Sequence, residues 1–394
     1  MLTYRTARIL AEKNFDSKII KEICIVEKHI PVVVLTGGPC AGKTTGLCYL
    51  QEKLANLGFH VFTVPEAPTL LMSGGITPKE NVLSLPDFQK SVFRLMRIME
   101  DEFKQAAQGT SSGKSIIICD RGLMDTKAYA PDGLFETIAS GESMSVTELR
   151  DGRYDAVFHL RTAALGAEEY YTLANNVARF ESVEEARIVD EKTLQAWVGH
   201  PHLKIIDNAT DFEGKMKRLL QGLCRVLGIP VPLEIERKFL IDPIDLEKMN
   251  ILHQAIEIEQ VYLISRNPDE EIRVRKRGQN GTFVYYQTMK RALRPSVRVE
   301  VEHRISEAEY EWSLRYRLPD TAMLRKRRFC FTFDNQYFEL DVLEEPRKGL
   351  YLLEIELTEE NERITIPPFI NVVKEVTNDS SFSNCSLASH PLKR

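Results

Sequence analysis

The residues Gly37-Gly38-Pro39-Cys40-Ala41-Gly42-Lys43-Thr44 decide how the first half of this chain folds. They fit G-x-x-x-x-G-K-[ST], a loop whose glycines let backbone amides surround a phosphate. An apolar run at residues 32–35 precedes the loop and a helical pattern at 44–57 follows it, as the motif requires. We therefore predict a site for a nucleoside triphosphate and Mg²⁺, with Lys43 on the β- and γ-phosphates and the Thr44 hydroxyl on the metal ion.

The segments after this loop alternate between strand and helix. Continuous apolar runs recur at residues 60–64, 115–119, 156–160 and 203–206, and helical segments include 44–57, 86–107 and 212–227. Such runs are typical of strands buried on both faces, and helices between them imply parallel pairing with right-handed crossovers. We predict an α/β P-loop NTPase domain with a parallel sheet over residues 31–229. A helical lead-in at 1–30 has no legible role.

Charged residues after two of these strands are candidates for catalysis, together with Lys43. Asp120 and Arg121 follow the run at 115–119. Asp120 would hold Mg²⁺ through water or take a proton, and Arg121 would brace a phosphate. Glu66 follows the run at 60–64 and is predicted to meet the same crevice, although a solvated loop glutamate explains it nearly as well.

Two weaker signals concern a lid and the base. Arg161, Arg179 and Arg187 lie in or near a polar helical stretch at 168–197. Arginines on a mobile lid would stabilise transition-state charge, but a solvated helix face explains them equally well. Asp207 and Asn208 end the last predicted strand and are candidates for contacts with the base. The N-K-x-D motif of guanine-specific GTPases is absent, so GTP and ATP both stay open.

This half resembles the P-loop nucleoside-kinase-like family called AAA-type domain 28. The resemblance spans residues 31–228 and rests on four features of the sequence. They are residues 37–45, Glu66, Asp120-Arg121 and Asp207-Asn208. The first of these adds Thr45 to the expected nucleotide-binding residues.

The pattern changes at Ile229-Pro230-Val231-Pro232. Beyond it, charged and apolar residues alternate in short segments separated by turn signals, which indicates an antiparallel sheet or barrel. Glu234, Glu236 and Lys238 share one strand face because side chains alternate along a strand. Acidic pairs and an arginine row with the same spacing follow: Glu300 and Glu302, Glu339 and Asp341, Glu354 and Glu356, and Arg273, Arg275 and Arg277.

A solvated strand face explains any single pair of this kind. Four acidic pairs and a basic row favour a barrel whose charged faces point inward, where opposite charges compensate each other. Inward acids would bind Mg²⁺ or Mn²⁺ through oxygen, and inward Lys and Arg would bind a polyphosphate.

These residues resemble the CYTH, or triphosphate tunnel metalloenzyme, superfamily, whose E-x-E-x-K hallmark is Glu234, Glu236 and Lys238 here. We place this domain at residues 233–394. The resemblance implies an eight-stranded antiparallel tunnel, giving the second half an α+β character, and metal-assisted attack of water on a triphosphate. The phosphate-side positions are Lys238, Arg273, Arg275, Lys290, Arg298, Arg315, Arg325 and Arg327. The metal-side positions are Glu234, Glu236, Glu300, Glu302, Glu339, Asp341, Glu354 and Glu356.

Composition excludes several classes of function. The 394 residues carry a net charge of −5, and the arginine rows are interleaved with acids, which argues against nucleic acid as a partner. The seven cysteines are scattered without a C-x-x-C pair, so a reducing cytosol fits best. No run of about 18 apolar residues exists to span a membrane. We predict a cytoplasmic protein, with a peripheral membrane role left open.

Three hypotheses for function remain. The union of both halves resembles the TRPL translocation defect proteins of insects. That implies a GTP-binding regulator that couples nucleotide binding to a partner or to acidic phospholipids, such as phosphatidic acid or phosphoinositides, in membrane-protein traffic. The basic cluster at 325–328 would suit such lipids. The alternative is a bifunctional enzyme, a small-molecule kinase joined to a metal-dependent triphosphatase of inorganic or organic triphosphate. In the third hypothesis the tunnel senses the kinase product.

Overall fold

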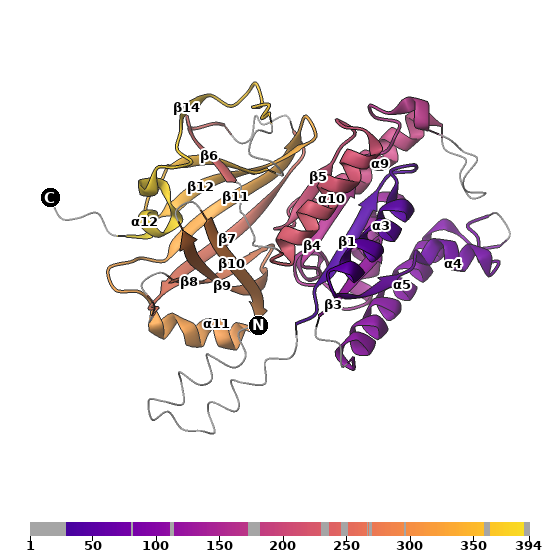
Figure 1. The fold of residues 1–394 in the computed structure, drawn as a ribbon, viewed down its shortest axis with the longest axis horizontal. Coiled ribbons are helices and arrows are strands. Elements are labelled where there is room, and N and C mark those ends of the chain that lie inside the picture. Colours follow the sequence, from indigo (N-terminus) through magenta and orange to yellow (C-terminus); the bar gives the residue numbers. More distant parts are fainter. Residues whose placement is uncertain are drawn as a thin grey trace.

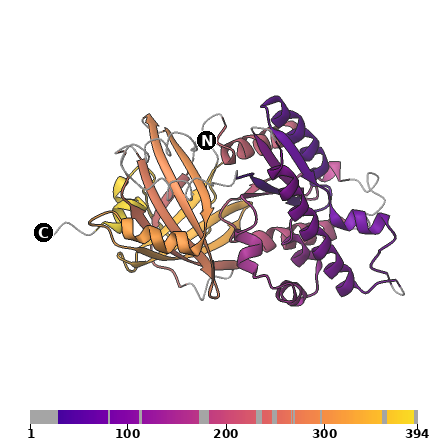
Figure 2. The same ribbon diagram turned by 90° about the horizontal axis from the view of Figure 1, so that it is seen from below.

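A computed structural model describes residues 29–79, 82–110, 114–171, 182–229, 236–245, 251–265, 267, 270–294, 297–357 and 363–389, without the side chains of 170 and 291–301. The expected lead-in therefore lies almost wholly outside the described residues. Two domains lie side by side along the long axis of the molecule, as Figures 1 and 2 show. The first domain is a parallel sheet between helices, and the second is a curved antiparallel sheet.

The first domain is built on a five-stranded parallel sheet in the order β2-β3-β1-β4-β5. Every strand predicted from an apolar run is present, which confirms the α/β fold. The strands are β1 (Val32–Gly37), β2 (His60–Val64), β3 (Ser115–Asp120), β4 (Ala156–Leu160) and β5 (Leu203–Ile206). Strands β1 and β3 are neighbours, so the phosphate loop after β1 and Asp120 at the end of β3 meet at one edge of the sheet.

Helices cover both faces of this sheet, and alternate residues of β1 show why its sequence is apolar throughout. Val32 and Val34 belong to the core on one face, and Val33 and Leu35 to the core on the other. The helices are α3 (Lys43–Asn56), α4 (Ala67–Ser73), α5 (Leu85–Gln108), α6 (Asp125–Tyr129), α7 (Leu134–Gly141), α8 (Val146–Asp151), α9 (Val183–Trp197), α10 (Phe212–Val226) and the short η1 (Glu168–Tyr170).

The described residues of the second domain form one antiparallel sheet of nine strands in the order β10-β9-β8-β7-β11-β12-β13-β6-β14, where eight were expected. Its strands are β6 (Glu236–Ile241), β7 (His253–Leu263), β8 (Glu270–Gln279), β9 (Thr282–Arg294), β10 (Val297–Ile305), β11 (Leu324–Phe333), β12 (Gln336–Glu345), β13 (Tyr351–Glu356) and β14 (Val372–Glu375). Its short helices are α11 (Glu307–Ser313), η3 (Leu314–Tyr316), η4 (Ser380–Phe382) and α12 (Asn384–Ala388).

The sheet is strongly curled. Strand β10 is first and β13 seventh in the order, so a flat sheet would separate them by about 29 Å at roughly 4.8 Å per strand. Yet His202 and Lys204, which are only two residues apart, contact Glu302 on β10 and Glu356 on β13. The sheet must therefore curve back on itself. Among the described strands, β10 and β14 are not paired with each other, so a seam remains.

Candidate functional site

The phosphate loop joins β1 to α3 in a conformation that only glycine permits at its two ends. Gly37 has a φ of 139°, and a Cβ there would lie 2.0 Å from the Leu160 carbonyl oxygen. Gly42 has a φ of 88° and precedes the first turn of α3, whose free amides point at the loop. Nζ of Lys43 donates to the carbonyl oxygens of Gly37 and Gly38, each at 2.9 Å. The strand, loop and helix required for phosphate binding are thus all in place.

Lys43 lies in a charged but desolvated setting. Burial and the nearby Arg121 guanidinium lower the pKa of Lys43 to about 8, against the opposing pull of three carboxylates. A bound triphosphate would favour the protonated amine, because opposite charge stabilises the charged form.

Arg121 lies beside Lys43 and is held by Glu66. It adopts a left-handed backbone conformation, with a φ of 71°. Its Nε donates to Oε1 of Glu66 at 2.7 Å, and its Nη1 lies 3.4 Å from the Gly37 carbonyl oxygen. Burial alone would raise the pKa of Glu66, but Arg121 and Thr69 outweigh it and lower that pKa to about 2. Glu66 is thus a charged partner of Arg121 and a weak base, and its role in the nucleotide site stays a prediction.

Asp120 has the properties expected of a metal-facing carboxylate. Its Oδ1 is buried and has no hydrogen-bond partner among the described residues. Burial raises the pKa of Asp120, and Lys43 only partly opposes that rise. A buried carboxylate oxygen without a proton donor suits Mg²⁺ or a water that Mg²⁺ holds. Asp120, together with the Thr44 hydroxyl at the start of α3, therefore fits a magnesium ion.

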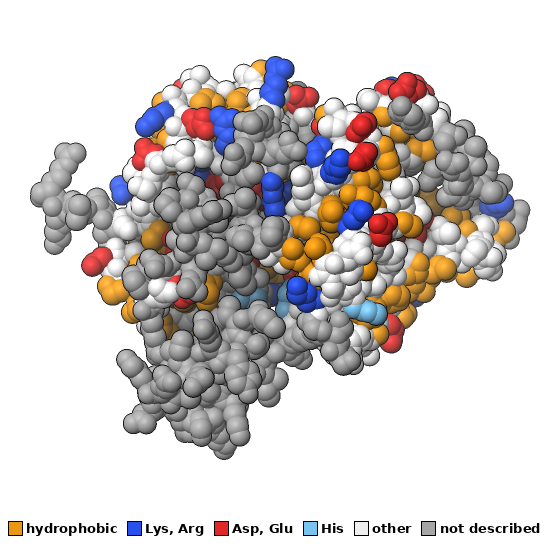
Figure 3. Space-filling model, viewed as in Figure 1, with side chains coloured by type: hydrophobic (Ala, Val, Ile, Leu, Met, Phe, Trp, Pro, Cys, Tyr) orange, Lys and Arg blue, Asp and Glu red, His pale blue; other side chains and the backbone are white. Residues whose placement is uncertain are grey.

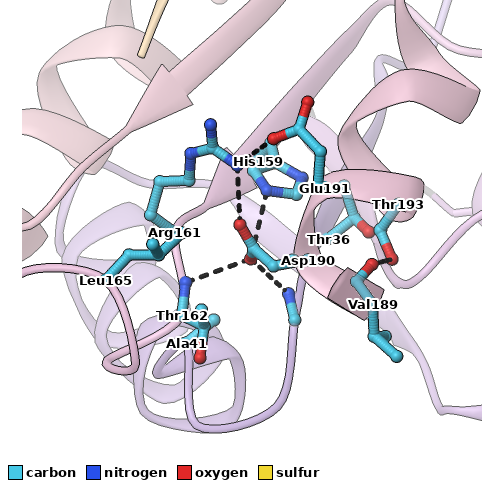
Figure 4. Close-up of polar contacts among 12 residues, drawn as sticks. Thr36, Ala41, His159, Arg161, Thr162, Leu165, Val189, Asp190, Glu191 and Thr193 are labelled. Atoms are coloured by element: carbon cyan, nitrogen blue, oxygen red, sulfur yellow. Dashed lines mark hydrogen bonds and ion pairs between the residues drawn. The ribbon is translucent and has the colours of Figure 1, made fainter. Parts of the chain in front are cut away.

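Asp190 of α9 organises the same loop, although no sequence motif pointed to it (Figure 4). Its Oδ1 accepts from the Gly38 amide at 2.8 Å and from the Thr162 amide at 3.0 Å, and its Oδ2 accepts from Nη1 of Arg161 at 2.8 Å. Asp190 is fully buried. A carboxylate from a distant helix thus fixes the phosphate loop to the segment after β4.

The predicted arginine lid is not what the structure shows for Arg161. Arg161 is only 7% exposed, and Nη1 also contacts Glu191 at 3.0 Å. A buried guanidinium bound to two carboxylates is a fixed support and not a mobile lid. Arg187 is half-exposed and binds the Ala164 carbonyl oxygen and Glu168, at 2.6 and 3.0 Å. Arg179 lies outside the described residues.

The contacts of Asp207 and Asn208 give no support to a role in base recognition. Nδ2 of Asn208 donates to the carbonyl oxygens of Thr162 and Leu165, at 2.8 and 2.7 Å. Its Oδ1 accepts from Lys215 at 2.7 Å, and Arg218 binds Asp207 at 2.7 Å. Both side chains stabilise the loops around them, so their contact with a base stays a prediction.

In the second domain, the charged rows gather on one face of the curled sheet, which we call the inner face. Directly paired residues share a face, and the register pairs Lys238 with Glu354, Glu354 with Glu339, and Asp341 with Arg328. Charged members of the inner face with described side chains include Glu236, Lys238, Glu271, Arg273, Arg275, Arg277, Lys290, Glu302, Arg304, Lys326, Arg328, Glu339, Asp341, Glu354 and Glu356.

Opposite charges on the inner face compensate each other. Arg328 binds Asp341 at 2.7 Å and Glu354 at 2.6 Å, and it also contacts Glu339. Lys238 lies 2.8 Å from Glu354 and contacts Glu236 at 3.4 Å. Burial alone would lower the pKa of Lys238, but these two carboxylates outweigh it and raise that pKa. An alternating network of this kind keeps buried charges ionised.

The register corrects three of the expected phosphate-side residues. Lys326 and Arg328 lie on the inner face, whereas Arg325 and Arg327 lie on the outer face, 45% and 55% exposed. Arg325 pairs with Glu259 at 3.2 Å, and Arg327 lies 3.7 Å from Glu344. The cluster proposed for lipid binding is therefore split between two faces, and its outer members have acidic partners. The third residue, Arg315, lies exposed in η3 and not on a strand.

Of the remaining expected residues, some have described side chains on the inner face and others do not. Arg273, Arg275 and Glu302 lie on the inner face, where Thr288 donates to Glu302 at 2.6 Å and Arg275 lies 3.8 Å from it. Lys290 shares that face through its pairing with Glu271. Glu234 lies outside the described residues. Arg298 and Glu300 are on β10, but their side chains are not described.

The inner face offers the oxygen donors that Mg²⁺ and Mn²⁺ prefer. In the part of the chain that the structure describes, no three His, Cys, Asp or Glu side chains gather closely enough to hold an ion. The acids are instead engaged with Lys and Arg. The donor chemistry of the described acids therefore fits a divalent cation.

Comparison with known proteins agrees with this division into two sites. Residues 32–215 match the AAA domain family AAA_28, and residues 232–364 match the CYTH domain family. An inorganic triphosphatase of Acetivibrio thermocellus is 30% identical over 160 residues, which cover 41% of this chain and 96% of that protein.

Solved structures also match part of the chain. The inorganic triphosphatase NE1496 is 28% identical, with a TM-score of 0.31, over 40% of this chain and 96% of its own. The PH1819 protein of Pyrococcus horikoshii is 22% identical, with a TM-score of 0.27, over 32% of this chain and 80% of its own. None of the described helices is both long and apolar enough to cross a membrane. Through its second domain, the chain belongs to the CYTH family.

Proposed function

We propose that this chain is a bifunctional enzyme in which the tunnel domain hydrolyses a triphosphate and the P-loop domain transfers a phosphoryl group from a nucleoside triphosphate. The observation that supports this proposal most directly is the inner face, where Lys238, Lys326 and Arg328 alternate with carboxylates in a buried network. Similarity to an inorganic triphosphatase over nearly the whole of that protein supports the first activity.

The inner face suits a short, linear polyanion. A triphosphate presents closely spaced negative oxygens, and buried Lys and Arg bind such oxygens strongly because water does not screen them. Lys326 is 4% exposed and Arg273 6% exposed. In the reaction, a water oxygen bonds to a terminal phosphorus, the bridging P–O bond breaks, pyrophosphate leaves, and the proton from the water passes to solvent. Inorganic triphosphate is the simplest substrate with this chemistry.

A divalent cation is part of this proposal. Glu236, Glu302, Glu339, Glu354 and Glu356 would hold it, with Glu234 and Glu300 as further candidates. When bound, it would polarise phosphoryl oxygens and offset their charge. Lys238 and Arg328 keep the carboxylates ionised and therefore ready to bind a cation: burial alone would raise the pKa of Glu354, but its basic neighbours hold it well below its usual value.

The P-loop domain would bind its nucleotide with Lys43 on the phosphates and with Asp120 and Thr44 toward Mg²⁺. The position of Asp120, with an unpaired buried oxygen beside Lys43, supports a role in Mg²⁺ binding or in taking a proton from an acceptor hydroxyl. The acceptor would be a small molecule.

A GTP-binding regulator in membrane-protein traffic remains the second candidate, because one observation favours it. A chain of hydrogen bonds runs from Gly38 through Asp190 and Arg161 to Asn335 at the tip of the β11–β12 hairpin. Such a chain offers a route by which nucleotide binding would change the second domain. Binding of acidic phospholipid has less support, because Arg325 and Arg327 have acidic partners.

Phosphate release from tripolyphosphate, ATP and GTP, each with Mg²⁺ or Mn²⁺, tests these proposals. We expect tripolyphosphate hydrolysis that Glu354→Gln abolishes and Lys43→Ala leaves intact, with nucleotide turnover showing the opposite pattern. Absence of all turnover, together with tight GTP binding and binding to phosphatidic acid vesicles, would favour the regulator.

A further inference from the structure

The end of the tunnel that faces the first domain is covered by that domain. Residues of the inner face contact it at the C-terminal ends of β8, β10, β11 and β13 and at the N-terminal ends of β7, β9 and β12. In an antiparallel sheet these are all the same end. The contacts therefore surround one mouth of the curled sheet, and they do not lie along one side of it.

Polar contacts hold this end closed. Arg277 of β8 donates to the Gly199 carbonyl oxygen at 2.8 Å, and the hydroxyl of Tyr286 of β9 donates to the Asp151 carbonyl oxygen at 2.5 Å. The hydroxyl of Tyr337 of β12 donates to the His200 carbonyl oxygen at 3.2 Å. Arg277 is only 2% exposed. A buried guanidinium and a buried phenol bound to carbonyl groups across an interface are well suited to a permanent contact.

Apolar packing explains why β7 carries the opposite polarity to its neighbours. On its inner face, where the other strands carry charge, β7 has Ile256 and Ile258. Both are buried in the same core cluster as Trp197 and Val198 of the first domain. The inner face of β7 is thus apolar where the first domain covers it, between neighbouring strands that carry charge.

Two basic side chains of the first domain reach the acids at this end. Nζ of Lys204 lies 2.5 Å from Oε2 of Glu356, and Nε2 of His202 lies 3.5 Å from Oε1 of Glu302. A small pocket beside them is lined by Lys204, Glu339 and Glu356, among others. Lys204 therefore faces a space that it shares with two acids of the inner face.

We propose that the P-loop domain closes one end of the triphosphate tunnel, with Lys204 and His202 as positioning residues that hold Glu356 and Glu302 in their working orientation. The inference rests on the proposed triphosphatase function. It makes the tunnel site complete only in the two-domain chain. Partners that orient a metal-binding carboxylate commonly change metal affinity by about 10- to 100-fold when removed.

The test uses the full chain without nucleotide and compares Lys204→Met, Lys204→Arg and Lys217→Met. Lys217 is an exposed lysine of α10 paired with Glu213, and it serves as the matched control. Two quantities are measured: Mn²⁺ affinity by calorimetry, and the Mn²⁺ concentration that gives half the maximal rate with tripolyphosphate. Lys204→Met should weaken both by about tenfold or more, while Lys204→Arg and Lys217→Met stay near the wild type.

Unchanged or tighter Mn²⁺ binding in Lys204→Met would overturn the inference, because Lys204 would then only compete with the cation. If Lys204→Met does not fold, His202→Gln takes its place with the same expectation. A wild-type chain that hydrolyses no tripolyphosphate would refute the proposed function, but calorimetry would still decide the inference: weaker Mn²⁺ binding in the variant supports it. Equal binding, or no binding to the wild type, overturns it.

Discussion

Arg161 and Asn335 connect the two domains by a hydrogen bond in which Nε of Arg161 donates to Oδ1 of Asn335 at 2.8 Å. Arg161 directly follows β4, and Asn335 lies in the turn between β11 and β12 with a φ of 58°. The same guanidinium binds Asp190, which in turn accepts from the Gly38 amide. Three side chains, those of Asp190, Arg161 and Asn335, therefore connect the phosphate loop to a hairpin of the tunnel.

Arg161→Ala should destabilise the whole chain. Removing this guanidinium leaves Asp190 buried with less compensating charge, a change that costs about 3 kcal/mol or more. Asn335→Gly removes only the contact between domains and suits the positive φ, so its cost should be about 1 kcal/mol. Denaturant unfolding measures both. Equal costs for the two variants would show that the contact with Asn335, and not the pairing with Asp190, is what matters.

Neighbouring basic residues on β11 should differ sharply in their effect on tripolyphosphate hydrolysis. Lys326 lies buried on the inner face beside Asp341, whereas Arg327 is 55% exposed on the outer face. We expect Lys326→Met to lower kcat/KM by about tenfold or more, because a buried cation binds phosphate strongly. Arg327→Met should leave it unchanged. Steady-state kinetics of both variants test this. A large loss in Arg327→Met and none in Lys326→Met would show that the register of β11 is wrong.

This register marks the boundary of what the sequence could predict. Alternating charges predicted one charged face, and the structure confirms that Glu339, Asp341 and Glu354 share it. Every residue at 325–328 is basic, so the alternation of charged and apolar residues does not show which of them point inward. Arg325 and Arg327 were therefore assigned to the wrong face. The pairing of Arg328 with Asp341 fixes the phase, and it exists only after folding.

Other features depended on contacts between distant residues. The strands of the first domain were predictable because each is apolar and flanked by helical patterns. The role of Asp190 was not predictable, because an aspartate within a polar helix looks like any solvated residue. Its role becomes visible only when α9 packs on the phosphate loop. The apolar inner side of β7 was not expected either, because Ile256 and Ile258 face the other domain on a sheet face that was predicted to be charged. Contacts between residues far apart in the sequence account for these failures: within the first domain for Asp190, and between the domains for Ile256 and Ile258.

Lys43→Ala should abolish tight binding of nucleoside triphosphate. Lys43 is the lysine of the phosphate loop, and its loss removes a charge that lies beside the expected phosphates. We expect affinity for both ATP and GTP to fall by about tenfold or more. Lys53→Ala, near the end of the same helix, is the control and should bind like the wild type. Calorimetry with each nucleotide would also show which base the site prefers, and unchanged affinity in Lys43→Ala would place the nucleotide elsewhere.

His200 should make the interface between the domains sensitive to acid. The imidazole is fully buried, with Nε2 3.1 Å from the Tyr154 carbonyl oxygen and Nδ1 accepting from the His202 amide at 3.0 Å. Both contacts are satisfied by the neutral ring with the proton on Nε2. A second proton on Nδ1 would break the bond with His202.

Burial is the main cause that lowers the pKa of His200 to about 3, although Asp151 opposes it. Between that value and the ordinary pKa of about 6.5, the unfolded chain binds a proton that the folded chain does not. The free energy of unfolding should therefore fall as the pH drops from about 6.5 toward 3, by up to about 1.4 kcal/mol per pH unit from this group.

Comparison with His200→Gln isolates this contribution from that of the carboxylates. Glutamine keeps a donor for the Tyr154 carbonyl oxygen but does not titrate, so the variant should be less stable than the wild type at neutral pH. The difference between the two free energies of unfolding should then shrink as the pH falls from 7 to 5, because only the wild type loses the contribution of a neutral imidazole. Denaturant unfolding at several pH values measures this difference, and parallel curves would mean that His200 binds its second proton equally well in both states.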